Sequence, residues 1–162
     1  LFTTLHSCHT SKNAGNSHIR QIATAAKRLD MSIDYADNHA LFIESAQWLG
    51  VPYRGGGRSK RGVDCSGLTK CIYKNVYDIE LSPSSQLQLD RDINRRVRKK
   101  HLKQGDLVFF SERKSARRIS HVGIYLKDGK FLHASSKRGV RIDYLDDQYW
   151  RRRWIIGGRI LK

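Results

Sequence analysis

The stretch ISHVGIYLKDGKFLHA, residues 119–134, alternates apolar and polar side chains on either side of a Lys-Asp-Gly sequence. This period of two predicts a pair of antiparallel strands joined by a tight hairpin. The length of the loop decides which residues pair across the hairpin. A two-residue Asp-Gly loop would pair Lys127 with Lys130 and would place His121 and His133 on opposite faces of the sheet.

The alternative is a three-residue loop in which Gly129 takes the left-handed conformation as a bulge. Leu126 then pairs with Lys130, and His133 lies opposite Gly123. In this register His121 is the diagonal neighbour of His133 on the same face. The opposite face would carry the aliphatic side chains of Val122, Ile124, Leu132 and Ala134. We prefer this register because it buries the aliphatic set together.

The rest of the chain divides into helical and strand-like segments. Helical spacing predicts helices that begin near Ser17, after Asp37 or Asn38, and after Asp64, with a short helix capped by Ser82 and begun by Pro83. Further strands are predicted over 106–110, 139–144 and 154–161. The charged segment 90–101 is expected to be a solvated loop or helix face. Helices followed by strands predict an α+β domain, with N-terminal helices packed on a five- to six-stranded antiparallel sheet.

The chain has 162 residues, with 31 Lys and Arg against 15 Asp and Glu, and a formal net charge of +16. This length allows one domain with a full core. No apolar run reaches about eighteen residues, so no segment of the sequence is expected to span a membrane. This charge predicts attraction to a polyanion such as nucleic acid, anionic lipid or acidic wall polymers. The alternative interpretation is a solvated surface whose charge only keeps the protein soluble.

The cysteines and glycines exclude several classes of site. Three cysteines, Cys8, Cys65 and Cys71, do not make a disulfide framework, and no Cys or His spacing is typical of a metal site. The glycine-rich loop 52–62 lacks the order of lysine and serine that a phosphate-binding loop needs. The sequence therefore predicts neither a metal nor another cofactor.

Cys65 is the best candidate for a nucleophile. A cysteine attacks as its thiolate, which a helix N-terminus or a nearby histidine favours. Cys65 follows the capping candidate Asp64 and so starts a predicted helix, whereas Cys71 lies within that helix like an ordinary buried cysteine. His121 would then serve as the base and His133 as the group that orients it. The competing interpretation is that all of these are ordinary core residues.

Four short motifs follow one another along the chain: VDCSGL (63–68), QGDLVFF (104–110), HVGIY (121–125) and FLHAS (131–135). In this order they resemble the motifs of the NlpC (NlpC/p-sixty) family of papain-like cell-wall endopeptidases. The resemblance covers about residues 38–162. It implies a papain-like fold and a triad in which Cys65 is the nucleophile, His121 the base and His133 the orienting residue.

The same resemblance implies residues that bind the substrate. Pro52 and Tyr53 match the family's Pro-Tyr motif, which implies that Tyr53 borders the thiol and helps to bind the oxyanion or the substrate. Asp64 and Ser66 match positions that contact substrate in some members, and Ser85 matches the family's serine motif.

The sequence departs from the family pattern at two positions near these motifs. Gly55 stands where an aromatic residue is usual, which opens that wall of the cleft. Pro83 replaces the usual arginine of the serine motif, so the carboxylate recognition that the family resemblance implies there is not carried over to this chain. Neither departure touches the triad.

The first residues, LFTTLHSC, resemble the end of a secretion signal that closes in a lipobox, in which Cys8 would be lipidated. Alternatively this segment is a loose end with a chance cysteine. Residues 9–16 are small and polar and predict a tether. We therefore divide the chain into a signal remnant or lipoprotein tether (1–16), a helical extension (17–37) and an NlpC-type catalytic domain (38–162).

Together these features predict a cysteine peptidase that hydrolyses peptide bonds in peptidoglycan stem peptides or cross-links through an acyl-enzyme. The alternative is a cell-wall or polyanion binding module that keeps the fold without turnover, against which the intact triad argues. Nucleic acid is not expected as a partner because base-reading and stacking motifs are missing. We expect an exported monomer in the periplasm or at the outer membrane, where its charge would meet anionic polymers or lipid.

Overall fold

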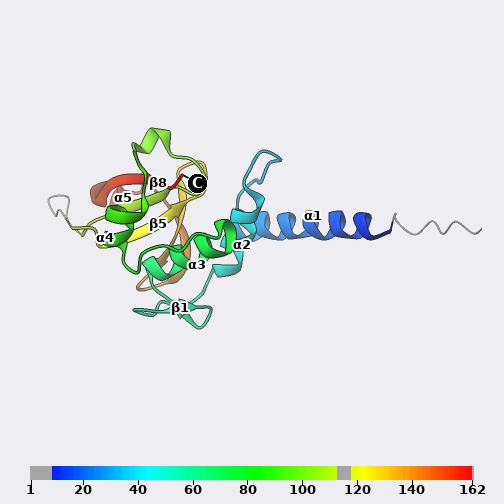
Figure 1. Cartoon of the computed structure of the whole chain (residues 1–162), viewed down its shortest axis with the longest axis horizontal. Coiled ribbons are helices and arrows are strands. Elements are labelled where there is room, and N and C mark those ends of the chain that lie inside the picture. The colour runs from blue at the N-terminus through cyan, green and yellow to red at the C-terminus, as the bar shows by residue number, and fades with distance from the viewer. Residues whose placement is uncertain (1–8, 113–117, 162) are drawn as a thin grey trace, which may run out of the picture.

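The computed structural model of the chain consists of a sheet, helices packed on it, and one helix that extends outward (Figure 1). It describes residues 9–112 and 118–161, with side chains from residue 14 onward. Among the described residues, four α-helices precede the strands of the main sheet along the chain. The predicted α+β class is confirmed.

A six-stranded sheet with strand order β3-β8-β4-β5-β6-β7 forms the centre of the fold, and each pair of neighbours is antiparallel. Its strands are β3 (Arg95–Val97), β4 (Leu107–Phe110), β5 (His121–Tyr125), β6 (Lys130–Ser135), β7 (Gly139–Tyr144) and β8 (Trp154–Arg159). A small second sheet pairs β1 (Arg58–Ser59) with β2 (Gly62–Val63). The five predicted strands are confirmed, with ends shifted by no more than two residues.

The hairpin of β5 and β6 takes the register that brings both histidines to one face. Leu126 lies opposite Lys130, and its amide donates to the Lys130 carbonyl at 3.0 Å. Gly129 has a φ of +76°, as predicted. Asp128 also has a positive φ, of 52°. The Asp-Gly pair therefore forms the tight turn itself, and the additional loop residue, Lys127, keeps the strands in the predicted register.

The two faces of the sheet bury different clusters. One face packs against α3 (Cys65–Tyr77), which α2 (His39–Trp48) covers in turn. The predicted aliphatic set of β5 and β6 lies in this main core. The opposite face carries a smaller cluster that includes Phe110, Phe131 and Trp150. Trp150 comes from α5 (Gln148–Arg153), a helix that the sequence patterns did not predict.

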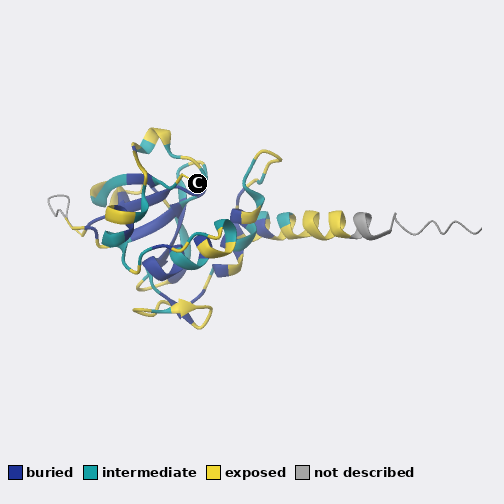
Figure 2. Cartoon of the chain, in the orientation of Figure 1, coloured by how far each residue is buried: buried dark blue, intermediate teal, exposed yellow. Residues whose placement is uncertain are grey.

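Helix α1 (His9–Leu29) begins eight residues before the predicted start at Ser17, so residues 9–16 are helical and not an irregular tether. A helix that is anchored at one end gains one hydrogen bond for each residue it adds, which favours this extension. The C-terminal part of α1 packs on α2 and contributes Ala25 and Leu29 to the main core. Its exposed part extends away from the domain (Figures 1 and 2).

The predicted helical extension thus shares its core with the rest of the chain. Cys8 lies outside the described residues. Among the helices that the structure describes, none has both the length and the apolar composition needed to cross a membrane.

The short helix after α3 begins later than predicted. Ser84, not Ser82, caps α4 (Ser85–Leu87), because the Ser84 hydroxyl accepts a hydrogen bond from the Leu87 amide at 3.3 Å. Ser82 instead donates to the Asp92 carboxylate at 2.7 Å. A π-helical turn over Gln88–Asp92 follows α4.

The charged segment 90–101 contains a strand that its composition did not predict. Strand β3 pairs with β8 at the edge of the sheet, and a 3-10 turn over Lys99–His101 follows it. Arg95 and Arg96 are exposed and only Val97 is buried. An edge strand tolerates charged side chains well, so the expectation of a loop or helix face was wrong at these residues.

Candidate active site

Cys65 is the first residue of α3. The Asp64 side chain caps this helix by accepting a hydrogen bond from the Gly67 amide at 2.7 Å. Helix α3 packs on β5, and the Cys65 thiol lies against the backbone of Val122, the residue that follows His121. The predicted position of this cysteine at a helix start is confirmed.

The environment of this thiol does not favour the thiolate in the free protein. Burial raises the pKa of Cys65, and the nearby Asp64 carboxylate raises it further, although the backbone amides of Val122 and Ser66 oppose both effects. The expectation of a net lowering of this pKa at the helix N-terminus is therefore wrong, because desolvation of the charged form outweighs the effect of the helix start. The thiol stays protonated at neutral pH and needs a base.

Three polar side chains on adjacent strands form one chain of hydrogen bonds. His121, at the start of β5, has its Nε2 atom 3.1 Å from Nδ1 of His133 on β6. The Nε2 atom of His133 lies 3.0 Å from Oδ2 of Asp143 on β7. The predicted contact between the two histidines is confirmed, and Asp143 extends the chain by one carboxylate.

The carboxylate determines the direction of these hydrogen bonds. Asp143, when ionised, can only accept, so His133 carries its hydrogen on Nε2. The Nδ1 atom of neutral His133 is then an acceptor, and His121 must donate from its Nε2. The lone pair of His121 therefore lies on Nδ1, where it can take a proton from a thiol.

Burial keeps both histidines neutral. Burial and the neighbouring His133 lower the pKa of His121 to about 3. Burial also lowers the pKa of His133, against the opposing effect of its hydrogen bond to Asp143. Trp150 stacks on His121 with ring centroids 5.3 Å apart, and Phe131 stacks on His133 at 5.0 Å. At neutral pH His121 is thus available as an acceptor of protons.

Asp143 was absent from the sequence prediction, although the sequence carries a signal for it. His133 pairs with Arg141 across β6 and β7, and Asp143, two residues further, shares that face. Its Oδ2 atom also accepts from the Trp150 indole at 2.9 Å, and its Oδ1 atom lies 2.6 Å from Nη2 of Arg141. Burial opposes its ionisation, but hydrogen bonds with His133 and Trp150 outweigh burial and lower the pKa of Asp143.

Cys65, His121 and His133 all line one cleft of about 640 Å³. Tyr53 also lines this cleft and is 39% exposed. Burial, followed by the proximity of Cys65 and Asp64, raises the pKa of Tyr53. Its hydroxyl therefore keeps its hydrogen and can donate to a substrate oxygen. The structure thus brings together Cys65, His121, His133 and Tyr53, four of the residues that the sequence proposed.

A sequence profile of the NlpC/P60 family matches residues 50–159, a span that includes the cysteine, both histidines and Asp143. The chain belongs to this family.

Named NlpC/P60 relatives cover much of the chain. The "Probable endopeptidase NlpC homolog" of Haemophilus influenzae is 42% identical over 115 residues, which are 71% of this chain and 58% of the relative. The "Murein DD-endopeptidase MepS/Murein LD-carboxypeptidase" of Escherichia coli (strain K12) is 32% identical over 167 residues, 97% of this chain and 86% of the relative. A solved NlpC/P60 family protein from Bacillus cereus has a TM-score of 0.71 at 31% identity, covering 81% of this chain and 42% of that one.

The chain therefore spans little more than half the length of the Haemophilus relative and most of the length of the Escherichia relative.

Three residues that the NlpC/P60 resemblance assigned to the substrate do not line the cleft. Asp64 accepts hydrogen bonds from the backbone amides of Gly56 and Gly67. The Ser66 hydroxyl lies 3.2 Å from Asp64 Oδ1 and 3.1 Å from the Pro83 carbonyl oxygen. Ser85 belongs to α4. Of the predicted substrate-binding residues, the structure brings only Tyr53 to the cleft, because Asp64 caps α3 and the Ser66 hydroxyl is hydrogen-bonded within the protein.

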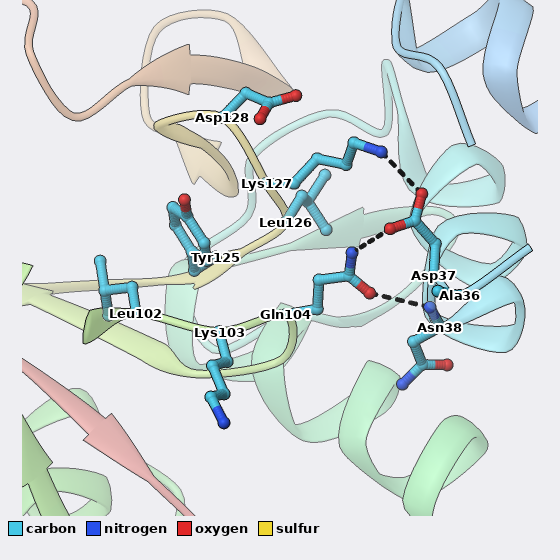
Figure 3. A pocket seen from close by; sticks show the side chains of 10 residues that line it. All are labelled: Ala36, Asp37, Asn38, Leu102, Lys103, Gln104, Tyr125, Leu126, Lys127 and Asp128. Carbon is cyan, nitrogen blue, oxygen red and sulfur yellow. Dashed lines mark hydrogen bonds and ion pairs between the residues drawn. The ribbon is translucent and has the colours of Figure 1, made fainter. Parts of the chain in front are cut away.

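A second hollow, of about 570 Å³, shares no lining residue with this cleft (Figure 3). Lys127 from the β5–β6 turn binds Asp37 at 2.7 Å, and Gln104 hydrogen-bonds to Asp37 and to the Asn38 amide. These contacts fasten the connection between α1 and α2 to the sheet. None of the residues that line the hollow is a cysteine or a histidine. Among the described residues, no group of three or more His, Cys, Asp or Glu side chains could hold a metal ion.

Proposed function

We propose that the protein is a cysteine peptidase that hydrolyses peptide bonds in peptidoglycan stem peptides or cross-links. The observation that carries this proposal is the cleft that holds Cys65 at a helix start beside a neutral His121 supported by His133 and Asp143. The name of the Escherichia coli relative, a murein endopeptidase and carboxypeptidase, supports peptidoglycan as the substrate class.

The first step forms a thioester. His121 takes the thiol proton on Nδ1 as the Cys65 sulfur attacks the peptide carbonyl carbon, and negative charge moves to the carbonyl oxygen. The Tyr53 hydroxyl and the amides at the start of α3 are the donors available to this oxygen. When the intermediate collapses, the C–N bond breaks and His121 gives its proton to the leaving amine. His133 remains neutral and, with Asp143, stabilises the transient imidazolium.

The second step regenerates the enzyme. A water molecule donates a proton to His121 as its oxygen attacks the thioester carbon. The C–S bond then breaks, the new carboxylic acid leaves, and the thiolate takes the proton back from His121. Besides the peptide substrate, water is the only co-reactant in these two steps, and residues of this chain carry all the proton transfers.

We place this activity outside the cytoplasmic membrane, in the cell envelope, where peptidoglycan lies. The net charge of +16 supports this location, since basic side chains are attracted to anionic envelope polymers and lipid. An anchor at Cys8 and a monomeric state are further proposals that rest on the sequence.

The test is digestion of purified peptidoglycan, with the new ends identified by mass spectrometry. Cys65→Ala should abolish the new ends and leave the fold intact, because the change removes one small side chain. Cys71→Ala is the matched control, since Cys71 lies in the same helix but not in the cleft, and it should retain most activity. Cleavage by Cys65→Ala at the wild-type rate would reject the mechanism. An absence of cleavage by the wild-type protein would favour a binding module on the same fold.

A further inference from the structure

The wall of the cleft beyond His133 is positively charged. Four cationic side chains line it, from the β6–β7 turn, from β7 and from α5: Lys137, Arg138, Arg141 and Arg153. Glu112, Asp143 and Asp147 are the carboxylates that line the same cleft. Asp143 is not free to bind a ligand cation, because Arg141 holds one of its oxygens and His133 and Trp150 hold the other.

Arg141 is the best placed of these cations. It lies directly opposite His133 in the β6–β7 pairing, and its side chain is 34% exposed, in the cleft. Its guanidinium forms one ion pair among the described residues, from Nη2 to Asp143 at 2.6 Å. The Nε atom is buried and has no hydrogen-bond partner there. A guanidinium offers five N–H donors in a planar fork that matches a carboxylate, so most of this capacity is unused.

The position of Arg141 indicates how far from the scissile bond its ligand lies. His121, His133 and Arg141 occupy three successive strands, and neighbouring strands are about 4.8 Å apart. Arg141 is therefore displaced by about 10 Å from the strand that carries the base. An extended peptide advances about 3.5 Å per residue, so for a substrate that runs across these three strands this distance corresponds to about three residues.

We infer that Arg141 binds a carboxylate of the peptide substrate about three residues from the bond that is cut. This inference rests on the proposed peptidase function and names the substrate class more narrowly, as a peptide with a free carboxylate at that distance. Lys137, Arg138 and Arg153 attract the same anion, and none of them forms an ion pair with another described residue.

Binding to an inactive protein tests the inference without turnover. The probes are a purified peptidoglycan stem peptide with free carboxylates and forms of it in which one carboxylate at a time is amidated. With Cys65→Ala protein, one of these amidations should raise Kd about ten- to a hundredfold, as expected for a lost charged hydrogen-bond partner. The double variant Cys65→Ala, Arg141→Gln should bind the free peptide with a Kd raised by the same factor relative to Cys65→Ala. Its Kd values for the free and the amidated peptide should be equal.

Arg95→Gln in the same Cys65→Ala background is the matched control, because Arg95 lies on β3, at the opposite edge of the sheet. It should leave both Kd values unchanged. Equal Kd values for the free peptide and every amidated form would overturn the inference. So would an Arg141→Gln effect of the same size on the free and the amidated peptide, because that result would show a structural role.

The outcomes also separate this inference from the proposed function. If the wild-type protein cuts no peptide while the carboxylate-dependent Kd difference is observed, the peptidase proposal fails and the carboxylate site stands. If the protein cuts peptides and Kd is insensitive to amidation, only the carboxylate site fails. In the active enzyme, the expected Arg141→Gln effect is a rise in KM for the free peptide that is absent for the amidated one.

Discussion

Replacing Asp143 by asparagine should slow the enzyme by disturbing the hydrogen-bond chain that orients its base. Both carboxylate oxygens receive donors, Oδ1 from Arg141 and Oδ2 from His133 and Trp150. The side chain of asparagine has only one oxygen, so its amide nitrogen must face either the Arg141 guanidinium or the rings of His133 and Trp150. In the second orientation His133 turns into the other tautomer and His121 loses its lone pair on Nδ1.

The size of the effect follows from the bonds that change. A hydrogen bond to a charged group contributes about 1.5–3 kcal/mol, which corresponds to about a ten- to hundredfold loss in kcat. In serine proteases, where the carboxylate touches the base directly, the same change costs about 10⁴-fold. Because Asp143 acts through a second imidazole, we expect Asp143→Asn to stay well below that limit.

The assay is muropeptide hydrolysis at saturating substrate, combined with ¹⁵N NMR of the imidazole nitrogens to assign the tautomers of both histidines. Asp146→Asn is the matched control, because Asp146 is an exposed carboxylate on the following turn that pairs with Lys99 and does not line the cleft. It should leave kcat and the tautomers unchanged. A kcat for Asp143→Asn within about twofold of wild type, with unaltered ¹⁵N shifts, would refute the role assigned to this carboxylate.

The remaining predictions concern pH and packing. Because the pKa of His121 is lowered from 6.5 to about 3, kcat/KM should hold its plateau well below pH 6; an acid limb centred near 6.5 would show a solvated base. Between the ordinary pKa of 6.5 and the lowered pKa of about 3, the unfolded chain binds a proton at His121 that the folded chain does not. The free energy of unfolding should therefore fall on acidification through this pH range by up to about 1.4 kcal/mol per pH unit. Urea titrations at pH 7 and 5 measure this decrease, and His121→Phe should reduce it. A Cβ at Gly123 would lie 2.7 Å from the Leu132 carbonyl oxygen, so Gly123→Ala should destabilise the fold by about 1–3 kcal/mol in thermal unfolding. Gly15→Ala, with nothing within 4 Å, should not destabilise it.

Local sequence patterns were sufficient wherever the deciding contacts lie close together in the chain. The β5–β6 register followed from a short loop and from the requirement that aliphatic side chains share a face, so the contact between His121 and His133 could be predicted. The start of α3 followed from Asp64, whose side chain reaches an amide only three residues away. The strands of the sheet and the α+β class followed from alternation and from the order of the elements.

Only the tertiary structure determined what surrounds these residues. Trp150 reaches the histidines and Asp143 because α5 packs against the sheet, and no local pattern of the sequence predicted that helix. The pKa of the Cys65 thiol was predicted in the wrong direction because a helix start can be identified from sequence, whereas burial depends on every element packed around it. Arg141 was overlooked for a related reason: a charged residue on a strand is usually solvated, and only the fold turns this one into the cleft. Desolvation and charge proximity depend on distances in space, which the chain acquires only when it folds.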